Sequence, residues 1–200
     1  MIKTLLKEVK EYKKDTLLSP VYVSIEAILE VLIPFLMAIL VDNGIEKGDM
    51  KSIWFYGFLM LVAAFVSLWA GAKSGKHAAI ASSGFAKNLR KAEYRKIQEF
   101  SFSNVDAYST SGLITRMMTD VTNIQNAYQM MIRVCVRAPL MLIASLVMAF
   151  IINKEMAMIF VAAVLVLGVV LFGIIFIVSP IFSRLFSRYD FLNASIQENC

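Results

Sequence analysis

Two stretches of this sequence contain no charged residue over a length that would cross a lipid bilayer. They are Ile53 to Ala72, with 20 residues, and Met156 to Ser183, with 28. A helix needs about 20 apolar residues to cross the roughly 30 Å hydrocarbon core of a bilayer. The whole chain of 200 residues is 58% hydrophobic and 18% charged, whereas soluble proteins average about 45 to 50% and about 25%. A soluble enzyme is therefore excluded.

Four segments in all have the length and hydropathy of a membrane-spanning helix. They lie at about residues 21–41, 53–72, 133–152 and 156–178. A β-barrel is excluded because its strands would alternate apolar and polar residues in segments of about ten. The first segment is longer than the apolar part of a signal peptide, carries two glutamates and has no small-residue cleavage site, so we expect it to be retained. The predicted fold class is an all-α membrane protein with four transmembrane helices.

Lysine and arginine are distributed unevenly between the segments that connect these spans. Fifteen of the 20 lie in residues 1–20, 73–132 and 179–200, whereas three lie in 42–52 and 153–155. Cytoplasmic loops carry an excess of Lys and Arg, so both termini are predicted to be cytoplasmic, in a multi-pass protein of the cell membrane. The bases form blocks between apolar runs rather than a basic surface on a polar fold. No nucleic-acid partner is therefore predicted.

Residues 1–18 are predicted to form an amphipathic elbow helix on the inner membrane face. Apolar residues recur there at helical spacing opposite four lysines, which is typical of interfacial helices; they are Ile2, Leu5, Leu6, Val9 and Tyr12. Ser19 and Pro20 then resemble an N-cap and a first-turn proline. An ordinary charged tail is the alternative.

The loops between the spans differ greatly in length, and the longest, 73–132, has 60 residues on the predicted cytoplasmic side. It is predicted to be a helical hairpin, because two segments with helical periodicity flank a tip rich in Ser, Asn, Asp, Thr and Gly. A helix from residue 53 to 100 would be about 72 Å long at 1.5 Å per residue. The fourth span is predicted to continue through Ser179 and Pro180 in the same way. Such long cytoplasmic extensions suit a transporter that is driven by a soluble motor.

The stretch NVDAYSTSGLITRMMTDVTNIQNAYQ resembles the loop between the second and third helices of ABC exporters of type I topology. The matching positions in this loop are Asp106, Leu113, Arg116, Asp120, Val121 and Gln125. The chain end, YDFLNASIQENC, resembles the family's approach to its second coupling helix, with matches at Asp190, Asn193, Gln197, Glu198 and Asn199. Val105, Ser111 and Gly112 depart from the usual aromatic, glycine and acidic residues. The likeness covers essentially the whole chain. It implies that residues 19–200 form four of the six helices of an exporter membrane domain, truncated before helices five and six and the nucleotide-binding domain.

The resemblance also implies a coupling helix at about residues 103–108 that docks on an ATPase domain. Its residues are Ser103, Asn104, Val105, Asp106, Ala107 and Tyr108. ATP and Mg²⁺ would bind to that missing domain, and the full transporter would be an ATP-hydrolysing translocase. This chain itself contains no ATPase site, because GAKSGK at 71–76 has the wrong spacing and follows no strand. The implied partners are the bilayer, nucleotide-binding domains, a second half-transporter and a hydrophobic substrate.

Four charged residues lie inside the predicted spans, near their cytoplasmic ends. Glu26 and Glu30 are spaced i, i+4 on the first helix, and so are Arg133 and Arg137 on the third. Such charges cost about 2.5 to 3.5 kcal/mol at the bilayer centre and usually face a cavity or a partner. We hypothesise that the four face an inner cavity and pair between the two helices. Snorkelling to the headgroups is the alternative.

Three prolines, Pro34, Pro139 and Pro180, are candidate hinges because proline bends a helix. No metal site is predicted, since the chain has two cysteines and a single histidine. Two further function classes stay open beside ATP-driven export. One is a small four-helix channel or proton-coupled efflux protein that uses Glu26 and Glu30 as proton carriers. The other is a membrane anchor or sensor whose cytoplasmic helices bind a partner.

Overall fold

The computed structural model describes residues 7–99 and 116–198, and for residues 181–198 the course of the backbone alone. The described residues are almost entirely helical and include no strand. Among them, four helices are long and apolar enough to cross a membrane; they lie within Lys7–Ile45, Met50–Gln98, Met117–Ile152 and Lys154–Pro180. The predicted all-α membrane fold is confirmed. The chain consists of two compact units, Met1–Ser145 and Leu146–Cys200.

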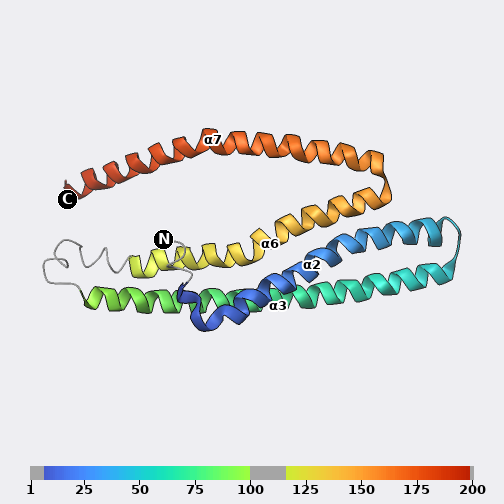
Figure 1. Cartoon of the computed structure of the whole chain (residues 1–200), viewed down its shortest axis with the longest axis horizontal. Coiled ribbons are helices and arrows are strands. Elements are labelled where there is room, and N and C mark those ends of the chain that lie inside the picture. Colours follow the sequence, from blue (N-terminus) through green and yellow to red (C-terminus); the bar gives the residue numbers. More distant parts are fainter. Residues whose placement is uncertain (1–6, 100–115, 199–200) are drawn as a thin grey trace. The chain divides into compact units, whose positions relative to one another are not determined.

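In the first unit, helices α2 (Lys13–Leu40) and α3 (Met50–Gln98) lie side by side (Figure 1). They are joined by a π-helical turn, η2 (Val41–Ile45), and a tight turn with Gly48 at φ +66°. Asp49 caps α3, because its carboxylate accepts hydrogen bonds from the Ser52 hydroxyl at 2.7 Å and from the Lys51 backbone N–H at 3.1 Å. These two bonds lower the pKa of Asp49. The connection is therefore a structured turn, shorter than the predicted loop 42–52.

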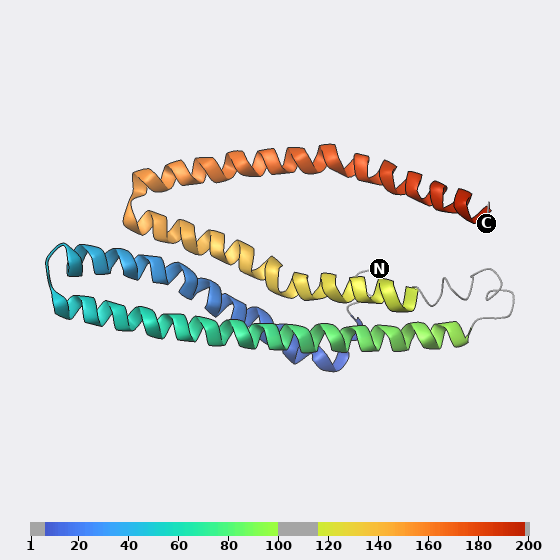
Figure 2. The same cartoon turned by 180° about the vertical axis from the view of Figure 1, so that it is seen from behind.

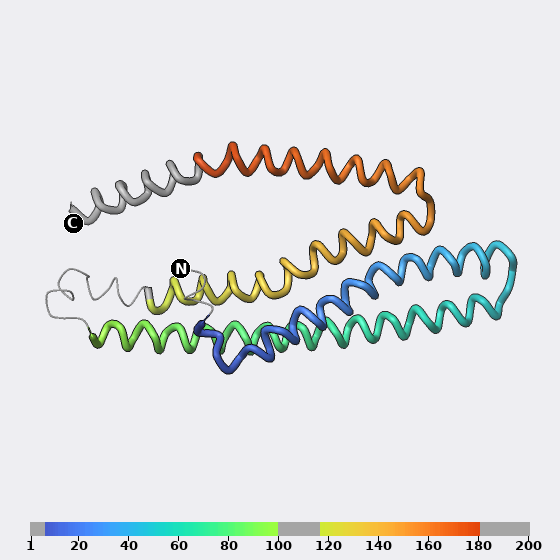
Figure 3. The backbone as a smooth tube through the Cα atoms, in the orientation of Figure 1, coloured from blue at the N-terminus to red at the C-terminus, as the bar shows by residue number. Residues whose placement is uncertain are grey.

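Helix α3 has 49 residues and continues without a break far beyond its apolar segment (Figure 3). At 1.5 Å per residue it is about 73 Å long, more than twice the roughly 30 Å hydrocarbon thickness. It contains no proline, which explains why the membrane-spanning part and the polar part form one helix. The predicted long helical extension is confirmed for α3.

The core of the first unit lies where the chain start, α3 and α6 (Val121–Ile152) meet. Its buried side chains are Val9, Ala78, Ala81, Phe85, Ala86, Leu89, Val121, Tyr128 and Ile132. The Phe85 and Tyr128 rings stack with their centroids 4.6 Å apart. A single π-helical turn, η3 (Arg116–Asp120), precedes α6. This core contains residues on both sides of the undescribed hairpin tip, so the two sides of the predicted hairpin pack together.

The chain start differs from the predicted elbow helix. Lys7–Tyr12 form a short 3₁₀ helix, η1, whose backbone breaks at Lys10 (φ 38°, ψ −108°), and α2 begins at Lys13. The first turns of α2 cross α3, as both views show (Figures 1 and 2). Val9, only 5% exposed, packs in the protein core, because the small residues on α3 leave room for it. The predicted lipid-facing role is therefore wrong for Val9, and residues 1–6 lie outside the described residues.

The predicted helix start at Ser19 and Pro20 is also wrong, since both lie inside α2. The Ser19 side chain is fully buried and contacts α3 instead of capping a helix. Thr16 and Ser24 each donate a hydrogen bond to the carbonyl four residues earlier. These bonds run along the helix on both sides of the proline, which is consistent with a helix that continues through it.

The second unit contains the end of α6 and helix α7 (Lys154–Glu198). Asn153 separates the two helices, and its side-chain oxygen accepts hydrogen bonds from the N–H groups of Glu155 (2.9 Å) and Met156 (3.2 Å). Most of the large apolar side chains from Met156 to Ile177 are exposed, as expected where a helix meets lipid or other membrane helices. Helix α7 continues through Pro180, as predicted.

Candidate functional site

A face of small residues on α3 allows the charged side chains of α2 and α6 to approach its backbone. A Cβ atom added at Gly71 would lie 2.8 Å from the Glu26 carboxylate, and one added at Gly75 would lie 3.9 Å from the Arg133 guanidinium. Gly71 and Gly75 are one helical turn apart. Because neither has a side chain, an acidic group from α2 and a basic group from α6 both lie close to α3 within one turn of each other.

Arg137 binds both glutamates of α2. Its Nη2 donates hydrogen bonds to the two carboxylate oxygens of Glu30, at 2.6 and 2.7 Å, and its Nη1 donates to Glu26 Oε1 at 3.3 Å. Residues four apart lie on the same helix face, which explains how one guanidinium reaches both. Hydrogen bonds between two ionised groups are shorter and stronger than those between neutral groups. The three side chains therefore join α2 to α6 at the level of the predicted cytoplasmic end of the membrane.

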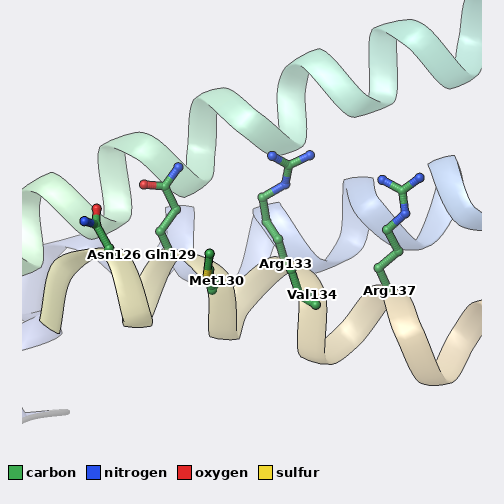
Figure 4. A pocket seen from close by; sticks show the side chains of 6 residues that line it. All are labelled: Asn126, Gln129, Met130, Arg133, Val134 and Arg137. Carbon is green, nitrogen blue, oxygen red and sulfur yellow. The ribbon is translucent and has the colours of Figure 1, made fainter. Parts of the chain in front are cut away.

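Arg133 lies apart from this group. Within the described residues it forms no hydrogen bond or ion pair, and its Nε is buried without a partner. Figure 4 shows Arg133 and Arg137 side by side on α6, both pointing toward the neighbouring helices. The Glu26 Oε2 atom is likewise buried without a partner among the described residues. The structure therefore brings together three of the four predicted charged residues, and the fourth, Arg133, has no partner among the described residues.

A partly open cavity of about 510 Å³ lies along α6 beside these arginines (Figure 4). Its lining residues are Asn126, Gln129, Met130, Arg133, Val134 and Arg137, which share one face of the helix because they are spaced three and four apart. Across from them, the Ser82 hydroxyl of α3 donates to Gln129 Oε1 at 3.3 Å. The cavity combines two guanidinium groups, two amides and two apolar side chains. It is suited to a ligand with a polar end and an apolar end.

A second polar group, which the sequence analysis missed, joins α2 to α3. The Ser74 hydroxyl donates to the Ser19 carbonyl at 3.1 Å, and the two hydroxyl oxygens are 3.4 Å apart. His77 Nδ1 pairs with Asp15 Oδ1 at 2.6 Å, and the His77 ring stacks on Tyr22 with centroids 5.6 Å apart. In the sequence, His77 served only as the single histidine that is too few for a metal site. The available signal was a small residue every three or four positions on α3, as in Ala63, Ser67, Ala70, Ser74 and Ala78.

Comparison of the sequence with known protein families identifies the family to which this chain belongs. The family model described as the ABC transporter transmembrane region matches residues 17–199. The chain belongs to this family. The resemblance to an ABC transporter membrane domain is thereby confirmed, and the protein is a multi-pass membrane protein.

Relatives of this ABC membrane domain include uncharacterized proteins from two bacteria. The Bacillus subtilis (strain 168) protein YfiB, described as an uncharacterized ABC transporter ATP-binding protein, is 32% identical over 174 residues; these cover 87% of this chain and 30% of the relative. A Mycobacterium tuberculosis (strain H37Rv) protein with the same description is 26% identical over 206 residues, covering 99% of this chain and 34% of the relative. The chain thus spans about a third of the length of these relatives.

The remaining predicted sites of the ABC membrane domain are described only in part. Pro34, Pro139 and Pro180 lie inside α2, α6 and α7, and each helix continues through its proline. The coupling segment 103–108, from Ser103 to Tyr108, lies outside the described residues. Among the described residues no group of three or more His, Cys, Asp or Glu side chains is placed to hold a metal ion.

Proposed function

We propose that this chain is the substrate-translocating part of an ATP-driven exporter, which moves hydrophobic or amphiphilic compounds such as drugs, lipids or peptides out of the cell. ATP would bind with Mg²⁺ to nucleotide-binding domains. A second half-transporter would complete the pathway, and the ends of this chain would face the cytoplasm. Alternating access between inward-facing and outward-facing states would carry the substrate across.

The observation that supports this proposal most strongly is the length of α3 in a member of the ABC transporter family. About 40 Å of the helix extends past the apolar segment, at 1.5 Å per residue. A rigid helix of this length carries a displacement from a soluble ATPase into the membrane. In support, both relatives are described as ATP-binding proteins and are about three times as long as this chain.

The charged residues favour export driven by ATP over export driven by protons. A proton carrier needs a carboxylate that releases and binds a proton during each cycle. Glu26 and Glu30 instead accept hydrogen bonds from Arg137. Both candidate carboxylates thus join α2 to α6, a structural role that supports the ATP-driven proposal over the proton-coupled one.

Transport measurements distinguish the two energy sources. The protein expressed from its complete gene is reconstituted into proteoliposomes, and uptake of a lipophilic fluorescent dye is measured. We expect uptake with ATP and Mg²⁺, none with a non-hydrolysable ATP analogue, and no loss when an ionophore abolishes the pH gradient. Uptake that needs the pH gradient and ignores ATP would contradict the proposal and favour the proton-coupled alternative. Empty liposomes serve as the control.

A further inference from the structure

The two arginines in the cavity differ in what they bind, although they lie one turn apart on α6. Arg137 donates three hydrogen bonds to the carboxylates of Glu26 and Glu30. Arg133 forms none with the described residues. Each guanidinium is cationic. The charge of Arg137 is compensated by the two carboxylates that it contacts, whereas Arg133 has no ion pair among the residues that the structure describes.

Arg133 lines the cavity without a hydrogen bond to any described residue. Its Nε is buried and out of reach of a ligand, so a ligand would bind the terminal Nη atoms of the guanidinium. A guanidinium matches the geometry of a phosphate or carboxylate group, which can accept two parallel hydrogen bonds. Such a ligand is therefore expected to be an anion.

The rest of the cavity indicates that the anion belongs to an amphiphile. Met130 and Val134 line the same cavity and have exposed side chains. A thioether adapts its shape to an alkyl chain. Arg133 begins the predicted span 133–152, so its guanidinium lies near the level of the inner lipid headgroups. Met130 lies one turn before Arg133 on α6, and Val134 follows it directly, so both apolar side chains flank the guanidinium. An alkyl chain attached to a headgroup at Arg133 would run along Val134 toward the apolar segment.

Cationic amphiphiles fit this cavity less well. The acidic groups nearest to it are Glu26 and Glu30, and both accept hydrogen bonds from Arg137. A cationic headgroup at Arg133 would be repelled by its guanidinium. Glu26 and Glu30 together carry one more charge than Arg137 compensates, but the carboxylate oxygen that has no partner among the described residues, Glu26 Oε2, is buried, so the charge that a ligand meets at Arg133 is positive.

We propose that the cavity on α6 binds an amphiphile with an anionic headgroup, such as an alkyl phosphate, and that Arg133 is the residue that binds the headgroup. That the bound amphiphile is also the exported substrate rests on the proposed function. Binding of the amphiphile to the cavity can be measured without transport. Asn126 and Gln129 supply further polar groups around the headgroup.

The test measures binding to the protein expressed from its complete gene, without nucleotide, in nanodiscs of phosphatidylcholine. The probes are a fluorescent long-chain alkyl phosphate and the alcohol with the same chain and dye. Arg133→Gln should weaken binding of the phosphate about tenfold or more, since a hydrogen bond to a charged group is lost, and leave binding of the alcohol unchanged. The affinity of Arg133→Lys for the alkyl phosphate should lie between those of Arg133→Gln and the wild type, because lysine keeps the charge and loses the paired hydrogen bonds.

Arg95→Gln is the matched control, because Arg95 is exposed at the end of α3 and its loss changes the net charge equally. It should leave both affinities unchanged. Equal effects of Arg133→Gln on the two probes, or no effect on the phosphate, would overturn the proposal. Displacement of the alkyl phosphate by inorganic phosphate at equal concentration would also overturn it, because the site would then bind simple anions. ATP-dependent transport is measured in a separate experiment, so the transport result can contradict the proposed function without contradicting the binding site, and the binding result can do the reverse.

Discussion

The Arg137 guanidinium donates two hydrogen bonds to the carboxylate of Glu30, at 2.6 and 2.7 Å, across the gap between α6 and α2. Removal of one partner leaves the other charged group without compensation in a half-buried position. We expect Arg137→Gln to lower the free energy of unfolding by about 1 to 3 kcal/mol. Thermal unfolding of the purified protein measures this loss.

A double-mutant cycle separates the Arg137–Glu30 contact from other effects of the substitutions. The double variant Arg137→Gln/Glu30→Gln should lose less stability than the two single variants added together, by about 0.5 to 3 kcal/mol. The pair Arg133→Gln and Glu30→Gln is the control and should be additive, since these side chains form no ion pair. Additive losses in both cycles would show that the contact between Arg137 and Glu30 contributes nothing to the free energy of unfolding.

Gly84 lies directly beneath the ring of Tyr12, so that a Cβ atom there would overlap the ring. Gly84→Ala should force the chain start away from α3 and lower the unfolding free energy by about 1 to 3 kcal/mol. Gly57→Ala is the matched control on the same helix, because nothing lies within 4 Å of its Cβ position. Alanine is the better helix former, so Gly57→Ala should leave the melting temperature unchanged or raise it. If the two variants behave alike, Tyr12 does not pack on Gly84.

The contact between Ser19 and Ser74 predicts a cross-link between α2 and α3. The two hydroxyl oxygens are 3.4 Å apart, which is close enough for a disulfide after small adjustments. With Cys135 and Cys200 replaced by serine, Ser19→Cys/Ser74→Cys should form a disulfide under mild oxidation, detectable by mass spectrometry. The control Ser24→Cys/Ser74→Cys should not, because position 24 lies more than one helical turn farther along α2. A cross-link in the control alone would contradict the packing of α2 on α3.

The spans and the long extension of α3 could be predicted because they depend on local composition. Charge-free runs of 20 residues or more have few alternatives to a membrane helix, and a proline-free segment of good helix formers continues the helix. Glu26, Glu30 and Arg137 were identifiable for a similar reason, since charges inside a span require a partner or a cavity.

The partners of individual side chains could not be predicted, because they depend on how the helices are rotated against each other. The periodicity of residues 1–18 shows an apolar face but cannot show whether lipid or protein covers it, and Val9 packs on protein. Arg133 and Arg137 are equivalent in the sequence pattern, yet only Arg137 reaches the glutamates. Asp15 and His77 are 62 positions apart, so that no local pattern connects them.

If an ATPase domain drives transport through this chain, the predicted coupling segment 103–108 must transmit the movement, so substitutions in this segment should separate ATP hydrolysis from transport. In the protein expressed from its complete gene, ATP hydrolysis and substrate transport are measured together in proteoliposomes for Asp106→Ala/Tyr108→Ala. We expect transport to fall to the background level while ATP hydrolysis continues, with Arg95→Ala as a control that changes neither. Transport that continues at the wild-type rate in the double variant would contradict the claim.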